Sequence, residues 1–185
     1  MISSNDLKPG LTILVDGEIY TVLEASQNKT ARSAMVVKAK VRNIRTGSNV
    51  ELSWGGGEKV EPAQIEKREM QYLYNDEDLY YFMDNDTYEQ IPLNKEQIGD
   101  ALKFIKENMS VTMLSYKGSV FAVEPPMFVE LEVKYTEPGF AGNTTTTSGK
   151  PATLENGYEL TVPMFVNIGD VIKIDTRTGE YMERV

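Results

Sequence analysis

Six basic side chains stand close together in the first quarter of the chain, with no carboxylate between them. They are Lys29, Arg32, Lys38, Lys40, Arg42 and Arg45. Cations gathered in this way bind phosphate, and a guanidinium also binds planar polar groups through its rigid fork of donors. Because the whole chain carries a formal charge of −9, this segment is the exception in an acidic protein. Anion binding is thus the first chemistry that the residues suggest.

Most catalytic chemistry is excluded by composition. The chain has no histidine and no cysteine, which removes the commonest general base, the thiolate nucleophile and the usual zinc ligands. We therefore predict no catalytic residue, no metal and no cofactor. Asp84 and Asp86 formally leave a carboxylate-based hydrolase open, but no nucleophile or base motif accompanies them. The segment around them lacks the glycine and glutamate of a calcium loop and is interpreted as a hairpin turn.

The charge is unevenly distributed. Residues 1–63 carry a net charge of +1, residues 64–128 a net charge of −6, and residues 129–185 a net charge of −4. Only the first third can approach a polyanion without repulsion over the whole domain. The sequence "MISSNDLKPG" lacks the features of a signal peptide, and no apolar run is long enough to span a membrane. We expect a cytoplasmic protein.

The basic residues are predicted to lie on a β-hairpin. Residues 34–44 alternate between apolar and basic side chains, which is typical of a half-buried strand with a basic outer face. Lys38, Lys40 and Arg42 would lie on that face, where ordinary solvation is the alternative explanation. Residues 28–33 would form the loop before this strand, with Arg32 unpaired near its tip. A second hairpin is predicted at Asp16-Gly17.

The rest of the chain also indicates small β-barrels. We predict an all-β fold of three barrels in tandem, with domains at residues 1–63, 64–126 and 127–185 and a linker at Glu124–Met127. One helix is predicted from Asn94, as N-cap, through an apolar stripe that ends at Ile105. The middle third is rich in tyrosine. Acidic neighbours favour packing over base stacking for these tyrosines, which are Tyr72, Tyr74, Tyr80, Tyr81 and Tyr88.

Several segments resemble the bacterial elongation factor P family. The strongest is "KPATLENGYELTVPMFVNIGD" at 150–170, which has the family's order of lysine, small residue, glycine, Val-Pro and second glycine. The segments "IDTRTGEY", "QYLYND" and "IGDALKF" also match, in the right order. The likeness covers essentially the whole chain.

This resemblance implies a fold and a function. The fold is a KOW-type barrel followed by two OB-type barrels, arranged in an L that mimics tRNA. Members are not enzymes. They are translation elongation factors that bind the ribosome beside the peptidyl-tRNA and relieve stalling at consecutive prolines. The resemblance also implies a monomer that acts without a membrane.

The resemblance places functional residues at the tip of the first domain. Arg32 occupies the position where the family commonly has a modified lysine, so its side chain would reach the CCA end of the peptidyl-tRNA. Whether Arg32 is rhamnosylated, otherwise modified or bare stays open, and an arginine-modifying enzyme is a candidate partner. The other residues predicted to contact RNA are Lys29, Thr30, Ala31, Ser33, Lys38, Lys40 and Arg42.

Two further sites follow from the family likeness in the last third. Tyr181 and Arg184 match positions that face the peptidyl-tRNA. Gly142, Asn143 and Thr144 match a loop that contacts the exit-site codon, although Asn143 replaces the usual aspartate. The alternative from another class is a generic OB protein that binds single-stranded nucleic acid. That alternative requires aromatic side chains on a basic face, whereas the tyrosines of this chain have acidic neighbours.

Overall fold

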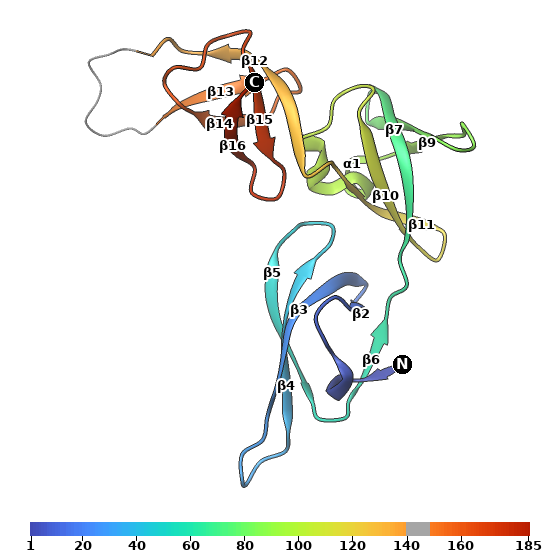
Figure 1. The fold of residues 1–185 in the computed structure, drawn as a ribbon. Helices are drawn as coiled ribbons and strands as arrows, with labels where there is room; N and C mark the ends of the chain where they lie inside the picture. The colour runs from blue at the N-terminus through green and yellow to red at the C-terminus, as the bar shows by residue number, and fades with distance from the viewer. Residues whose placement is uncertain (140–148) are drawn as a thin grey trace. The chain divides into compact units, whose positions relative to one another are not determined.

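A computed structural model describes residues 1–139 and 149–185 of the chain. Within these ranges the chain forms three antiparallel sheets in sequence order (Figure 1). It divides into two compact units. One comprises Met1–Lys67 with Leu114–Ala122, and the other comprises Arg68–Met113 with Val123–Val185. The all-β prediction is confirmed.

The first sheet has six strands in the order β1-β6-β2-β3-β4-β5. The strands are β1 (Ile2–Ser3), β2 (Thr12–Val15), β3 (Glu18–Asn28), β4 (Val36–Asn43), β5 (Asn49–Gly55) and β6 (Lys59–Pro62), and a 3-10 turn spans Ser4–Asp6. The hydroxyl of buried Ser4, beside β1, donates to the carbonyl of Gly55 at 2.8 Å. Because Gly55 ends β5, this bond joins the two edges of the sheet into a barrel. The barrel encloses Ile13, Val22 and Val41, among other apolar residues.

The second sheet has the order β11-β10-β7-β8-β9. Its strands are β7 (Glu66–Asp76), β8 (Leu79–Asp84), β9 (Gln90–Leu93), β10 (Ser110–Tyr116) and β11 (Ser119–Glu124). Among the tyrosines, Tyr72 is buried, and Tyr74 stacks on Tyr81 with ring centroids 4.8 Å apart. Packing therefore accounts for these three tyrosines.

The predicted helix is much shorter than its apolar stripe suggested. Asn94 and Gln97 form the expected capping box, but α1 spans only Lys95–Ile98. Gly99 follows with a φ of 72°, a left-handed conformation that ends an α-helix. The chain continues as a 3-10 helix over Gly99–Lys103. Ile105 is still buried, so the apolar pattern predicted burial correctly and helix length wrongly.

The third sheet has the order β14-β13-β12-β15-β16. Its strands are β12 (Phe128–Thr136), β13 (Lys150–Leu154), β14 (Glu159–Val162), β15 (Val171–Asp175) and β16 (Glu180–Arg184). Contacts between the edge strands β14 and β16 close it into a barrel. Its core includes Leu131, Leu154 and Ile174, and Phe104 from the segment after the 3-10 helix inserts among them.

Two aspartates hold turns at strand ends. Asp84 accepts N–H bonds from Asp86 and Thr87 and pairs with Arg68. Asp175 pairs with Arg177 through both carboxylate oxygens, at 3.0 and 2.8 Å. The backbone N–H donors and Arg68 hold the pKa of Asp84 below its usual range. The Arg177 guanidinium does the same for the pKa of Asp175.

These pKa shifts predict an acid sensitivity. A carboxyl whose folded-state pKa is depressed stabilises the fold above its ordinary pKa, and this stability is lost as the pH falls through the folded-state pKa. We expect stability to fall as the pH drops below about 4, and Asp84→Asn to flatten that dependence. Urea denaturation of both proteins between pH 2.5 and pH 6 is the measurement. An unchanged slope in Asp84→Asn would contradict the role given to this carboxylate.

Candidate RNA-binding tip

The basic hairpin extends from the first barrel as strands β3 and β4. The last paired residues are Asn28 and Val36, which leaves residues 29–35 as the connecting loop. Within it, the Ser33 N–H donates to the Thr30 carbonyl at 3.2 Å, and the hydroxyls of the same two residues are hydrogen-bonded. These bonds define a β-turn with Ala31 and Arg32 at its centre.

The backbone of this turn does not require glycine. Neither Ala31 nor Arg32 has a positive φ, so each adopts a conformation open to any L-residue. The turn is nevertheless fixed at its base by Thr30 and Ser33, whose side chains face each other. The sequence therefore builds a defined tip without the flexibility that glycines would add.

The tip is exposed and its cations are not neutralised by close partners. Residues 29–34 are all exposed. Among the ion pairs that the described part of the N-terminal unit contains, none involves Lys29 or Arg32. An exposed guanidinium without a carboxylate partner keeps its donors available for an incoming phosphate or carbonyl oxygen. Arg32 therefore has the geometry expected of a contact residue.

The strand below the tip confirms the predicted alternation. Val37, Ala39 and Val41 are at most 1% exposed, whereas Lys38, Lys40 and Arg42 point outwards. The outer face is less basic than its own strand suggested, because neighbouring strands supply acids. Lys40 lies opposite Glu24 on β3 and opposite Glu51 on β5.

Two of the cations beyond the tip, Lys40 and Arg45, have carboxylate partners, whereas Arg42 has only a neutral one. The Lys40 ammonium lies 3.3 Å from the Glu24 carboxylate, and Arg42 Nε donates to Asn49 Oδ1 at 3.1 Å. Arg45 turns back to pair with Glu18. Glu24, Ser26, Lys38, Lys40 and Glu51 line one shallow groove. Within the described part of the N-terminal unit, Lys29 and Arg32 at the tip and Lys38 and Arg42 on the strand thus form no ion pair.

The two predicted residues of the last strand differ in environment. Tyr181 on β16 is partly buried and packs against the core of the third barrel. Arg184 is half exposed, with Nη1 3.5 Å from Asp170 Oδ2 and its guanidinium 5.1 Å from the centre of the Phe165 ring. Neither partner was predictable from sequence, because Phe165 and Asp170 lie on the loop before β15, distant from Arg184 along the chain. The predicted loop residues Gly142, Asn143 and Thr144 fall outside the described residues.

The described residues contain no group of three or more carboxylates placed to hold a metal ion. No helix in the ranges 1–139 and 149–185 is long and apolar enough to cross a membrane.

Comparison with known proteins covers all three parts of the chain. Residues 3–60 match the KOW-like domain of elongation factor P, residues 65–123 its OB domain, and residues 129–184 its C-terminal domain. Proteins named elongation factor P from Thermoanaerobacter sp. (strain X514) and Acetivibrio thermocellus are each 56% identical over the full length of both chains. The one from Clostridium botulinum (strain Eklund 17B / Type B) is 55% identical over the same span.

A solved structure of eukaryotic translation initiation factor 5A from Methanococcus jannaschii is also similar. It is 21% identical and covers 66% of this chain and 89% of its own, with a TM-score of 0.49. The domains and the full-length relatives define this protein as a translation elongation factor built from a KOW-like barrel and OB barrels. The chain belongs to the elongation factor P family. The resemblance predicted from sequence is confirmed.

Proposed function

We propose that this factor binds the ribosome beside the peptidyl-tRNA and relieves stalling at consecutive prolines. Arg32 would reach the CCA end of that tRNA, with Lys29, Thr30, Ala31 and Ser33 around it. The observation that carries the proposal is the exposed Arg32 guanidinium at the centre of a hydrogen-bonded turn. Family membership supports the ribosome as the partner.

The factor would act by positioning. A reactant held in a productive geometry reacts faster because part of the entropic cost is met before the transition state. Proline reacts slowly, so a tRNA end held by the Arg32 tip gains most from such help. The peptide bond would still be made by the ribosome, and the chain would supply no nucleophile or base.

The proposal extends to the rest of the molecule. Lys38, Lys40 and Arg42 would make secondary contacts with RNA phosphates, and the Glu24 carboxylate makes the contact of Lys40 weaker than those of the tip. We also propose that the factor works in the cytoplasm as a monomer, with domain boundaries near residues 63 and 126. The state of Arg32, bare or modified by an arginine-directed enzyme, is decided by peptide mass spectrometry of the native protein.

The test is synthesis of a proline-repeat reporter in a reconstituted translation system. Addition of the factor should raise the yield of the proline-repeat protein and leave a proline-free reporter unchanged. Equal stimulation of both reporters would argue against a role in proline stalling. High affinity for short oligonucleotides without any effect on translation would favour a generic nucleic-acid-binding protein.

Arg184→Ala should weaken activity while leaving stability nearly unchanged. In the proposed function Arg184 binds a tRNA phosphate. In the free protein its side chain makes only a half-exposed ion pair with Asp170 and a contact with Phe165, so the fold loses little when it is removed. Such pairs contribute at most about 1 kcal/mol to folding. We expect a several-fold loss in the reporter assay and a melting temperature close to that of the unmutated protein. Lys134→Ala, which removes another exposed cation of this barrel, is the control, and full activity of Arg184→Ala would remove Arg184 from the site.

A further inference from the structure

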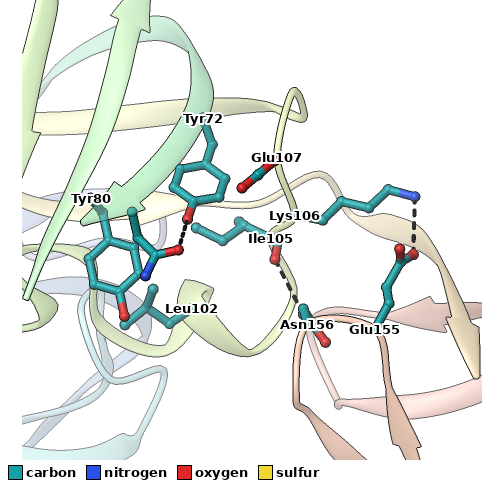
Figure 2. A pocket seen from close by; sticks show the side chains of 9 residues that line it. Tyr72, Tyr80, Leu102, Ile105, Lys106, Glu107, Glu155 and Asn156 are labelled. Atoms are coloured by element: carbon teal, nitrogen blue, oxygen red, sulfur yellow. Dashed lines mark hydrogen bonds and ion pairs between the residues drawn. The ribbon is translucent and has the colours of Figure 1, made fainter. Parts of the chain in front are cut away.

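The unit of Arg68–Met113 and Val123–Val185 contains a cleft of about 510 Å³ that the proposed function does not use. Tyr72 and Tyr80 form one wall, and the opposite wall carries Lys106 and Glu155 (Figure 2). Leu102 and Glu107 also line the space.

The walls of the cleft are held in place by hydrogen bonds. The Asn156 side chain donates to the carbonyls of Lys103 and Ile105 at 2.8 and 3.3 Å. Glu155 Oε1 accepts the Glu132 N–H at 3.0 Å. The Tyr72 hydroxyl donates to Asn75 Oδ1 at 3.4 Å. A cleft whose walls are already ordered loses less entropy when a ligand binds.

Tyr80 supplies most of the accessible ring surface of the aromatic wall. The centroids of Tyr72 and Tyr80 lie 6.2 Å apart with their planes tilted by 34°. Tyr72 is only 5% exposed, and Tyr80 is half-buried. The faces of tyrosine rings attract cations and also stack on planar groups. Leu102 adds apolar surface suited to an aliphatic stem.

The charge of the cleft favours a cation over an anionic planar group such as a nucleotide. The Lys106 ammonium lies 3.3 Å from the Glu155 carboxylate, so these two charges offset each other. Glu107 forms no ion pair within the described part of its unit. Burial raises the pKa of Tyr72 to about 12, and the charges of Tyr80 and Glu107 add to the rise. The negative potential of Glu107 therefore extends to the aromatic wall and would repel a phosphate.

We propose that this cleft receives an arginine or lysine side chain of a protein partner. The cation would lie between the Tyr80 ring and Glu107, and its aliphatic stem would pack along Leu102. RNA is disfavoured because residues 64–128, which supply most of the lining, carry a net charge of −6. The inference rests on the proposed function in one respect, because a ribosome-bound factor meets protein as well as RNA surfaces.

The test uses the isolated full-length chain, so its outcome does not depend on translation. The probe is the blocked tripeptide Gly-Arg-Gly, followed through the backbone amide resonances of Tyr72, Tyr80 and Glu107. The matched probe carries citrulline, which keeps the shape of arginine without its charge. We expect saturable binding of the arginine peptide, with a Kd on the order of millimolar, and no saturable binding of the citrulline peptide.

A variant pair separates this cleft from general surface charge. Glu107→Gln should weaken binding of the arginine peptide about threefold or more, whereas Glu89→Gln, which removes an equal charge outside the lining, should not. Equal binding of the two peptides, or equal losses in the two variants, would overturn the proposal. So would tighter binding of spermidine or of uridine monophosphate at the same resonances, since a polyamine or a nucleotide would then be the better occupant.

Discussion

Arg32→Ala should remove most of the stimulation of proline-repeat synthesis while leaving the fold intact. Charge-assisted hydrogen bonds of an arginine contribute about 1.5–3 kcal/mol each. A contact of that size made in the transition state corresponds to a loss of roughly tenfold or more in rate. The turn itself is held by Thr30 and Ser33, so an exposed side chain at its centre contributes little stability. The measurement is the initial rate of reporter synthesis at matched factor concentrations.

Two further variants show which property of the tip matters. Arg32→Lys keeps the charge but loses the planar fork, so it should restore activity only in part. Lys29→Ala should cause a smaller loss of activity than Arg32→Ala. We expect it to lower the general affinity for RNA to an extent that depends on salt concentration. Full activity of Arg32→Ala, or a larger defect in Lys29→Ala, would show that the functional tip lies on another residue. Unchanged circular dichroism of all three variants confirms that the fold is not the cause.

Phe104→Ala should cause the largest loss of stability among the changes considered. Phe104 is 6% exposed, packs in the core of the third barrel, and meets Tyr158 edge to face with centroids 5.2 Å apart. Truncation of a buried phenylalanine to alanine costs about 3–5 kcal/mol because it removes apolar contacts and leaves a cavity. Phe128→Ala, at a position 38% exposed, is the matched control and should cost much less.

Two spectroscopic signals show which unit of the chain the Phe104→Ala change destabilises. Trp54 is the single tryptophan and packs against the core of the first barrel. Its fluorescence therefore reports unfolding of that barrel, whereas near-ultraviolet circular dichroism of the tyrosines is dominated by the rest of the chain. We expect Phe104→Ala to shift the tyrosine transition to lower urea and to leave the Trp54 transition in place. A shift of equal size in both would contradict a local role for Phe104.

The parts of the fold that were predicted correctly depend on residues close to one another in the sequence. Asp16-Gly17 takes positive φ values of 50° and 81°, as a two-residue hairpin requires. The alternation from Val37 to Arg42 gave the buried and exposed faces of β4 correctly. The helix after Asn94 was predicted too long because the apolar stripe continues past Gly99 while the backbone leaves the α-helix there.

The parts of the site that sequence could not predict depend on distant partners. Lys40 faces Glu24 and Glu51 only because three strands pair in one register. Arg184 meets Phe165 and Asp170 for a similar reason, because β16 pairs with β15 beside the loop that carries both residues. The ion pairs of Lys40 and Arg45 were therefore not predicted from sequence. The unpaired state of Arg32 was predictable from its neighbours in sequence, because Ala31 and Ser33 are small and no carboxylate lies nearby in the loop.

The ordinary backbone of the tip has a consequence for how such factors can diverge. Ala31 and Arg32 have no positive φ, so other L-residues can replace them without strain. The barrel and its hairpin do not dictate what the apex carries, and mutation can exchange the side chain at the apex while the scaffold is inherited unchanged. For protein engineering, the same freedom makes position 32 suited to an unnatural amino acid of chosen reach and charge.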